Sequence, residues 1–150
     1  MPIFRNVTEQ ELSDVARLEQ QSFSDSWSEK SLQDTNKQPQ TMIAVAEVEG
    51  QIAGYCILYY VVDEGEIARI AVDENFRRQG IGRGLLDYIC EQCKEKGVER
   101  LLLDVRESNE RARQFYHQYG FEIDGVRKAF YENPKEDAVL MSKRIDNLFH

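Results

Sequence analysis

The chain has 150 residues and a formal net charge of -8, with 41% hydrophobic and 31% charged residues. That length suits one domain with a substantial core, and the composition is neither that of a disordered chain nor that of a membrane-embedded one. An acidic chain without a basic stripe argues against nucleic acid as a partner. The longest apolar run, residues 52–62, is too short to span a membrane, and no secretory signal opens the chain, so we expect a cytoplasmic protein.

The N-terminal part predicts a short strand and two helices. The strand covers residues 3–6, and Thr8-x-x-Glu11 is a capping box that opens the first helix. Ser28 is expected to cap the second helix, which runs to about residue 36.

Antiparallel strands are expected next. Residues 41–48 and 51–61 are predicted strands, and Glu49-Gly50 between them suits a tight hairpin. A further strand follows and ends at Val72.

The second half alternates helices and strands. The expected elements are a helix over 82–96, a strand over 100–105, a helix over 109–119, and strands over 121–131 and 138–144. Because a helix separates the strand ending at Val72 from the strand over 100–105, those two strands should be parallel with a right-handed crossover. The chain therefore predicts a single α/β domain over residues 1–150, with a mixed, mostly antiparallel sheet flanked by helices.

Residues 77–84 read Arg-Arg-Gln-Gly-Ile-Gly-Arg-Gly and lie between a predicted strand and a predicted helix. Glycines allow backbone N–H groups to approach an anion closely, and the N-terminus of the following helix adds a positive dipole end. Local positive charge in an acidic chain indicates a ligand site for a polyanion.

Two common phosphate loops do not fit this segment. A P-loop requires Lys-Ser or Lys-Thr after its last glycine, where this chain has Arg83-Gly84, and a dinucleotide fingerprint requires a third glycine where Leu85 stands. The remaining alternatives are an ordinary glycine-rich turn and a different anion site.

The pattern Arg77-x-x-Gly80-x-Gly82, after a strand ending in Ile-Ala-Val, resembles the acetyl-CoA pyrophosphate loop of the GNAT acetyltransferase superfamily. The resemblance covers essentially the full length, and it implies a GNAT-like single domain with acetyl-CoA as cosubstrate and no metal. The residues that it places at acetyl-CoA are Ile70, Ala71, Val72, Arg77, Arg78, Gln79, Gly80, Ile81, Gly82, Arg83 and Asn109.

Within that superfamily, residues 103–109, Leu-Asp-Val-Arg-Glu-Ser-Asn, together with the later Phe-Tyr and Tyr-Gly-Phe, resemble the RimI-type ribosomal-protein-alanine N-acetyltransferases. The resemblance implies transfer of acetyl to the α-amine of a protein that begins with alanine, such as a ribosomal protein. Two other functions remain open: acetylation of a small-molecule amine, and acyl-CoA sensing without catalysis.

Asp104 is the candidate base, because it stands at the carboxyl end of a predicted strand, where ligands collect in open α/β sheets. The matching family position is usually Glu, so the side chain is one methylene shorter and we expect a water relay. The alternative is an Asp that bonds the backbone of the following turn. Glu66 and Glu107 are the fallback acids.

Tyr116 belongs to a helical stripe that packing alone would explain, but the resemblance assigns it the protonation of the leaving thiolate. Trp27, on the early helical segment, and Tyr131, in the pair Phe130-Tyr131, match residues at the family's peptide site, and both could equally be core aromatics. We read Cys90 and Cys93 as packing residues on a helix face, since the chain offers no second Cys pair for a metal or a disulfide framework.

Overall fold

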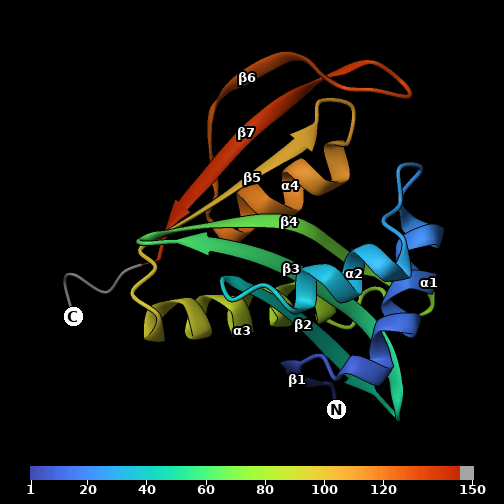
Figure 1. Ribbon diagram of the computed structural model, residues 1–150. Coiled ribbons are helices and arrows are strands. Elements are labelled where there is room, and N and C mark those ends of the chain that lie inside the picture. The colour runs from blue at the N-terminus through green and yellow to red at the C-terminus, as the bar shows by residue number, and fades with distance from the viewer. Residues whose placement is uncertain (146–150) are drawn as a thin grey trace.

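The computed structural model describes residues 1–145, which form a seven-stranded sheet in the order β1-β2-β3-β4-β5-β7-β6 with helices on both faces (Figure 1). The strands are β1 (Ile3–Asn6), β2 (Thr41–Val48), β3 (Gln51–Val61), β4 (Glu64–Val72), β5 (Arg100–Arg106), β6 (Glu122–Tyr131) and β7 (Glu136–Arg144). The helices are α1 (Leu12–Ser22), α2 (Glu29–Asn36), α3 (Ile81–Glu95) and α4 (Glu110–Tyr119). The mixed sheet with one parallel pair, β4 and β5, confirms the predicted fold class.

Two helix starts differ from the prediction. The capping pair is present, because the Thr8 N–H donates to the Glu11 carboxylate at 3.0 Å, but a short 3₁₀ turn follows it and α1 begins only at Leu12. The helix predicted over 109–119 begins at Glu110, and Asn109 is its cap, since the Asn109 side chain accepts the Ala112 N–H at 3.1 Å. Asn is a good cap, and a cap residue cannot be separated from the first helical residue by the sequence alone.

The core has two parts, one on each face of the sheet. On strand β2, Ile43 and Val45 pack with α1 and α2, whereas Met42 and Ala44 face α3 and α4. β2 is therefore buried on both faces, which explains its unbroken apolar sequence. None of the helices within residues 1–145 is long and apolar enough to cross a membrane.

Gly54 on β3 allows the start of α3 to lie directly against the sheet. A Cβ at this position would lie 2.9 Å from the Ala71 carbonyl oxygen, 3.1 Å from Ile81 Cγ2 and 3.3 Å from Leu85 Cδ1. The first of these neighbours is backbone, which cannot move away cheaply. The absence of a side chain at Gly54 thus sets the distance between α3 and the sheet.

We expect Gly54→Ala to lower the free energy of unfolding by about 1–3 kcal/mol, because the methyl group overpacks this contact. Urea denaturation would measure the loss. The matched control is Gly125→Ala on β6, where a Cβ has no neighbour within 4 Å and should change stability by no more than about 0.5 kcal/mol. Equal effects of the two substitutions would contradict the packing argument.

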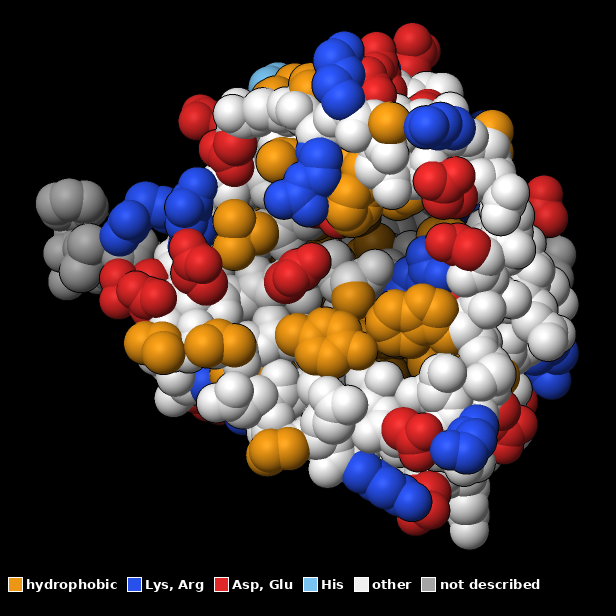
Figure 2. Space-filling model, turned by 45° about the horizontal axis from the view of Figure 1, so that its top comes forward, with side chains coloured by type: hydrophobic (Ala, Val, Ile, Leu, Met, Phe, Trp, Pro, Cys, Tyr) orange, Lys and Arg blue, Asp and Glu red, His pale blue; other side chains and the backbone are white. Residues whose placement is uncertain are grey.

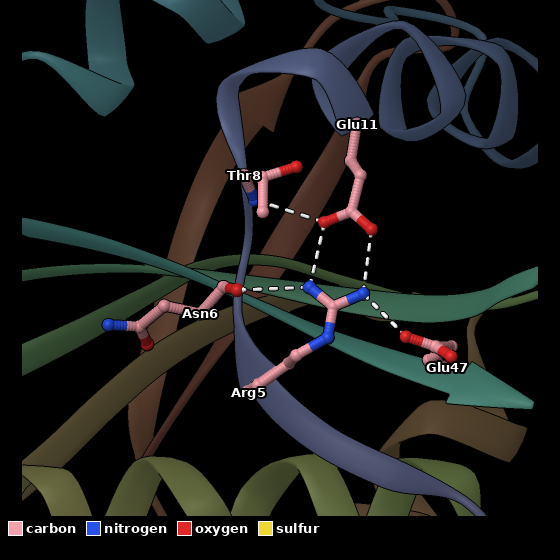
Figure 3. A network of polar contacts seen from close by, with 5 residues as sticks. All are labelled: Arg5, Asn6, Thr8, Glu11 and Glu47. Carbon is pink, nitrogen blue, oxygen red and sulfur yellow. Dashed lines mark hydrogen bonds and ion pairs between the residues drawn. The ribbon is translucent and has the colours of Figure 1, made fainter. Parts of the chain in front are cut away.

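Arg5 ties strand β1 to both the first helical turn and strand β2 (Figure 3). Its guanidinium donates two bonds to the Glu11 carboxylate, at 2.8 and 2.7 Å, and a third to Glu47 at 2.6 Å. Bidentate pairing of this kind is both strong and geometrically specific. The arrangement fixes the N-terminal strand against the sheet edge.

The Arg5 guanidinium lowers the pKa of Glu11 from 4.5 to about 2. A carboxylate whose pKa is depressed by folding stabilises the protein above its ordinary pKa, and that stabilisation disappears as the pH falls through the folded value. We therefore expect wild-type unfolding free energy to fall more steeply between about pH 4.5 and 2 than that of Glu11→Gln. At pH 7 the variant should be less stable by about 1–2 kcal/mol. Glu9→Gln, an exposed neighbour, is the control for thermal and urea denaturation across pH.

Candidate active site

Strands β4 and β5 begin side by side and then diverge (Figure 1). Their parallel ladder joins only residues 64–66 to residues 100–102, although β4 continues to Val72 and β5 to Arg106. Beyond Glu66, β4 keeps its pairing with β3 but has an open edge toward β5. The sheet is therefore split in its middle.

A pocket of about 570 Å³ lies at this split, lined by residues 66–70 of β4 and 103–106 of β5 together with parts of α4, β6 and the segment after α1. Figure 2 shows a face on which hydrophobic side chains gather beside a central hollow, with acidic and basic side chains along its edge. The structure brings six of the residues predicted for the site to this pocket: Trp27, Ile70, Asp104, Asn109, Tyr116 and Tyr131.

Two carboxylates share the pocket. Asp104 stands two residues beyond Leu102, the β5 partner of Glu66 at the last rung of the parallel ladder. Burial raises the pKa of Asp104, and the positive charge of Arg127 partly offsets this effect. Burial also raises the pKa of Glu66, and the nearby negative charge of Asp104 raises it further. Of the fallback acids, Glu66 therefore lies at the pocket, whereas Glu107 is exposed and outside its lining.

Tyr116 reaches the pocket from α4 and is only 7% exposed. Its ring packs edge-on against Phe115 and Phe121, with centroids 5.3 and 5.6 Å away. Burial raises the pKa of its hydroxyl, which therefore stays protonated at neutral pH. Among residues 1–145 no side chain or backbone group bonds that hydroxyl, so it can donate to a ligand.

Tyr131, at the end of β6, is held by Arg106 of β5. The Arg106 guanidinium carbon lies 4.5 Å from the Tyr131 ring centroid, and its N–H groups donate to the carbonyl oxygens of Glu132 and Pro134, both at 2.9 Å. Burial raises the pKa of Tyr131 to about 12, with the charge of Asp104 as the second cause. Arg106 thus fixes the β6–β7 turn beside the pocket, a role that its sequence position did not reveal.

Residues 77–84 follow β4 and lead into α3, as predicted. Gly80 precedes the helix with a φ of +75°, a conformation that L side chains rarely adopt. Arg77, Arg78 and Gln79 are exposed, whereas Ile81 is 2% exposed and anchors the helix in the core. The open N-terminus of α3 and the adjoining arginines form a cradle suited to an anion.

Arg83 lies in the first turn of α3, within the predicted helix. Its guanidinium carbon is 5.4 Å from the ring centroid of Tyr119 on α4. A helix that starts at Ile81 turns this side chain toward α4, while Gly82 packs at the ring of Phe115. Arg83 therefore contributes to the contact between the two helices.

Trp27 lies in a different element from the one predicted. It occurs in the segment between α1 and α2, two residues before α2 begins, and not on a helix. Its backbone N–H donates to the Glu19 carboxylate at 2.8 Å, and it lines the pocket. Glu19 itself is 0% exposed, and sequence reasoning missed it.

The cysteines behave as predicted, since Cys90 and Cys93 are buried on α3 and free. Within residues 1–145, no group of three or more His, Cys, Asp or Glu side chains is arranged to hold a metal ion.

Residues 12–121 match the acetyltransferase (GNAT) family. The chain belongs to this family. Its GNAT relatives include the [ribosomal protein bS18]-alanine N-acetyltransferase of Escherichia coli K12, 32% identical over 83% of this chain and 85% of the relative. The Haemophilus influenzae protein of the same name is 34% identical over 95% of this chain and 98% of its own length.

Solved structures agree with the GNAT assignment. The crystal structure of the ribosomal-protein-S18-alanine N-acetyltransferase from Escherichia coli superposes with a TM-score of 0.88 at 30% identity, covering 100% of both chains. The predicted superfamily, and the predicted similarity to the ribosomal-protein-alanine N-acetyltransferases within it, are therefore confirmed.

Proposed function

We propose that this GNAT enzyme transfers acetyl from acetyl-CoA to the α-amine of a protein that begins with alanine, with ribosomal protein bS18 as the acceptor in the cytoplasm. The names of its relatives support this acceptor. The observation that carries the proposal is the meeting of Asp104, Glu66 and Tyr116 in one pocket, at the split where the β4 edge is open.

The residues around the split fit acetyl-CoA. The open edge of β4 beyond Glu66 offers backbone groups to pair with the amides of the pantetheine arm, in the manner of an added strand. The N-terminus of α3, with Gly80, Arg77 and Arg78, suits the pyrophosphate. Acetyl-CoA supplies a thioester, whose carbon–sulfur bond is replaced by an amide bond to the acceptor nitrogen.

The acceptor amine must lose a proton, since an ammonium group cannot attack a carbonyl carbon. The reference pKa of an α-amine is about 7.7–8.0, so a nearby carboxylate whose pKa is raised is sufficient as the base. Asp104 and Glu66 supply two such groups on neighbouring strands. We assign the base to this pair, with a water bridging to the amine where the short Asp104 side chain does not reach.

The departing sulfur develops negative charge, and we assign the stabilisation of that charge to the Tyr116 hydroxyl, which lines the pocket. A thiol has a reference pKa of about 8.5, so a thiolate is a weaker base than the ionised form of a buried tyrosine. Tyr116 therefore acts chiefly by donating a hydrogen bond to the sulfur as the carbon–sulfur bond breaks. The proton lost by the acceptor amine balances the negative charge of the departing thiolate.

The phosphate cradle gives a binding prediction. Replacing Arg77 and Arg78 together with glutamine should raise the Kd for CoA by about ten- to a hundredfold, because charge-assisted bonds to phosphate are lost. Calorimetric titration at low and high salt would measure this, and the difference from wild type should shrink as salt increases. Arg17→Gln, at an exposed position on α1, is the control. An unchanged Kd in the double variant would place the phosphates elsewhere.

The function itself is tested by CoA release from acetyl-CoA with three kinds of acceptor. These are peptides that carry the bS18 N-terminus with a free alanine, the same peptides blocked at the α-amine, and a panel of small free amines. Release only with the unblocked peptides supports the proposal. Release only with free amines would make this GNAT enzyme a small-molecule acetyltransferase, and CoA binding without release would make it a sensor.

A further inference from the structure

The segment between α1 and α2, residues 23–28, forms one wall of the pocket but belongs to neither helix nor strand. Phe23, Asp25 and Trp27 from this segment line the pocket together with Glu66 and Asp104. No residue of the phosphate cradle at 77–80 lines it. The segment therefore faces the place where the acceptor amine must meet the base, and not the phosphate-binding end.

Arg69 of β4 holds this wall. Its side chain is 12% exposed, and one terminal nitrogen donates to the Asp25 carbonyl oxygen at 2.8 Å and approaches the Asp25 carboxylate at 3.3 Å. The guanidinium carbon lies 4.2 Å from the ring centroid of Phe23 and 5.3 Å from that of Trp27. Three alternate residues of the wall are thus in contact with one side chain.

Glu19 of α1 contacts both Arg69 and the wall. Its carboxylate, 0% exposed, lies 3.1 Å from Arg69 Nε and accepts the Trp27 N–H at 2.8 Å. The hydroxyl of Tyr55, also 0% exposed, donates to the other carboxylate oxygen. Glu19 therefore orients the arginine and the wall together.

A buried ion pair of this kind is poorly explained by stability alone. Removing two charges from water costs about as much as their attraction returns, and apolar residues of similar volume would serve stability at least as well. Its advantage is geometric, because the rigid planar guanidinium donates to Asp25 from a fixed position while its charge lies beside the Glu19 carboxylate. We therefore expect the ion pair to serve the surface that these contacts hold in place.

We propose that Arg69 is a positioning residue for the acceptor, which sets the wall of residues 23–27 against which the N-terminal peptide binds. This inference rests on the proposed peptide acceptor. It requires that loss of Arg69 weaken acceptor binding while leaving acetyl-CoA binding intact.

The test compares Arg69→Gln with wild type in steady-state kinetics, varying peptide and acetyl-CoA separately. We expect the KM for the alanine peptide to rise about tenfold or more, with the KM for acetyl-CoA within about twofold and kcat at saturating peptide within about threefold. Arg69→Lys, which keeps the charge but not the planar fork, should recover part of the peptide KM. Arg100→Gln on β5, outside the pocket, is the matched strand control.

A double variant and a binding titration accompany the kinetic test of Arg69→Gln. Glu19→Gln/Arg69→Gln removes both buried charges and serves if Arg69→Gln alone does not fold, with the same kinetic expectation. Trp27 is the only tryptophan, so its fluorescence reports binding of the alanine peptide in the presence of CoA without turnover. The apparent Kd from this titration should rise in parallel with the peptide KM.

A lowered melting temperature with an unchanged peptide KM would overturn the inference and leave Arg69 a folding residue. Equal increases in both KM values, or a fall in kcat alone, would also overturn it. Failure of the proposed function appears differently, as absence of peptide acetylation by the wild type itself.

Discussion

Tyr116→Phe is expected to lower kcat by about ten- to a thousandfold while leaving the Kd for acetyl-CoA nearly unchanged. The substitution removes one hydroxyl from a ring that stays packed between Phe115 and Phe121. A bond made only to the developing thiolate contributes to the transition state and not to the bound ground state. Steady-state kinetics with a titration of CoA would separate the two quantities.

Tyr119→Phe is the matched control on the same helix. Its hydroxyl bonds Asp87 and lies outside the pocket, so its loss should change kcat by less than about threefold. If Tyr116→Phe and Tyr119→Phe had the same kcat as wild type, Tyr116 would be a packing residue. If Tyr116→Phe instead raised the Kd for CoA and left kcat intact, its hydroxyl would serve binding.

Asp104→Asn/Glu66→Gln is expected to lower kcat/KM for the acceptor by about a hundred- to ten-thousandfold, the usual contribution of a positioned base. Each single variant should lose less, because the other carboxylate remains in the pocket. A loss in the double variant that exceeds the product of the two single losses would show that the two carboxylates substitute for each other in the same proton transfer.

The pH dependence of kcat/KM tests how the charge of Asp104 changes the pKa of Glu66. The base is active when deprotonated, so kcat/KM should rise with pH through its pKa, which burial places above the ordinary carboxyl range. In Asp104→Asn the negative charge that raises the pKa of Glu66 is gone, and the acidic limb should move to lower pH. Glu107→Gln is the control, with an unchanged profile. An acidic limb that shifts upward in Asp104→Asn would exclude Glu66 as the remaining base.

Local patterns were sufficient to predict the sheet and the loop before α3. The crossover through a helix predicted the parallel pair, and the parallel pair brings Asp104 beside Glu66. The glycine spacing at Gly80 and Gly82 predicted the loop before α3, because that geometry depends on neighbouring residues only. Asp104 and Tyr116 were placed by matching a family motif, and both line the pocket; their roles in catalysis remain proposals.

Contacts between distant parts of the chain were not predictable in this way. Arg69 and Glu19 are 50 residues apart in the chain, and only the packing of α1 on β3 and β4 brings them together. Nothing in either local sequence distinguishes a buried arginine from an exposed one. The contact of Arg83 with Tyr119 was not predictable for a related reason: the direction of this side chain depends on where α3 begins, which the loop pattern leaves open by a residue or two.

The divergence of β4 and β5 also bears on how the protein avoids self-association. An unpaired strand edge is a template for strands of other molecules. The open edge of β4, however, lies in the interior of the sheet between β3 and β5, where another chain's strand cannot approach along its length. The outer edges are poor templates, since β1 has four residues and β6 has an irregular register and carries Asp124, Arg127 and Lys128. The edge of β4 that is left open for substrate is thus sheltered from aggregation.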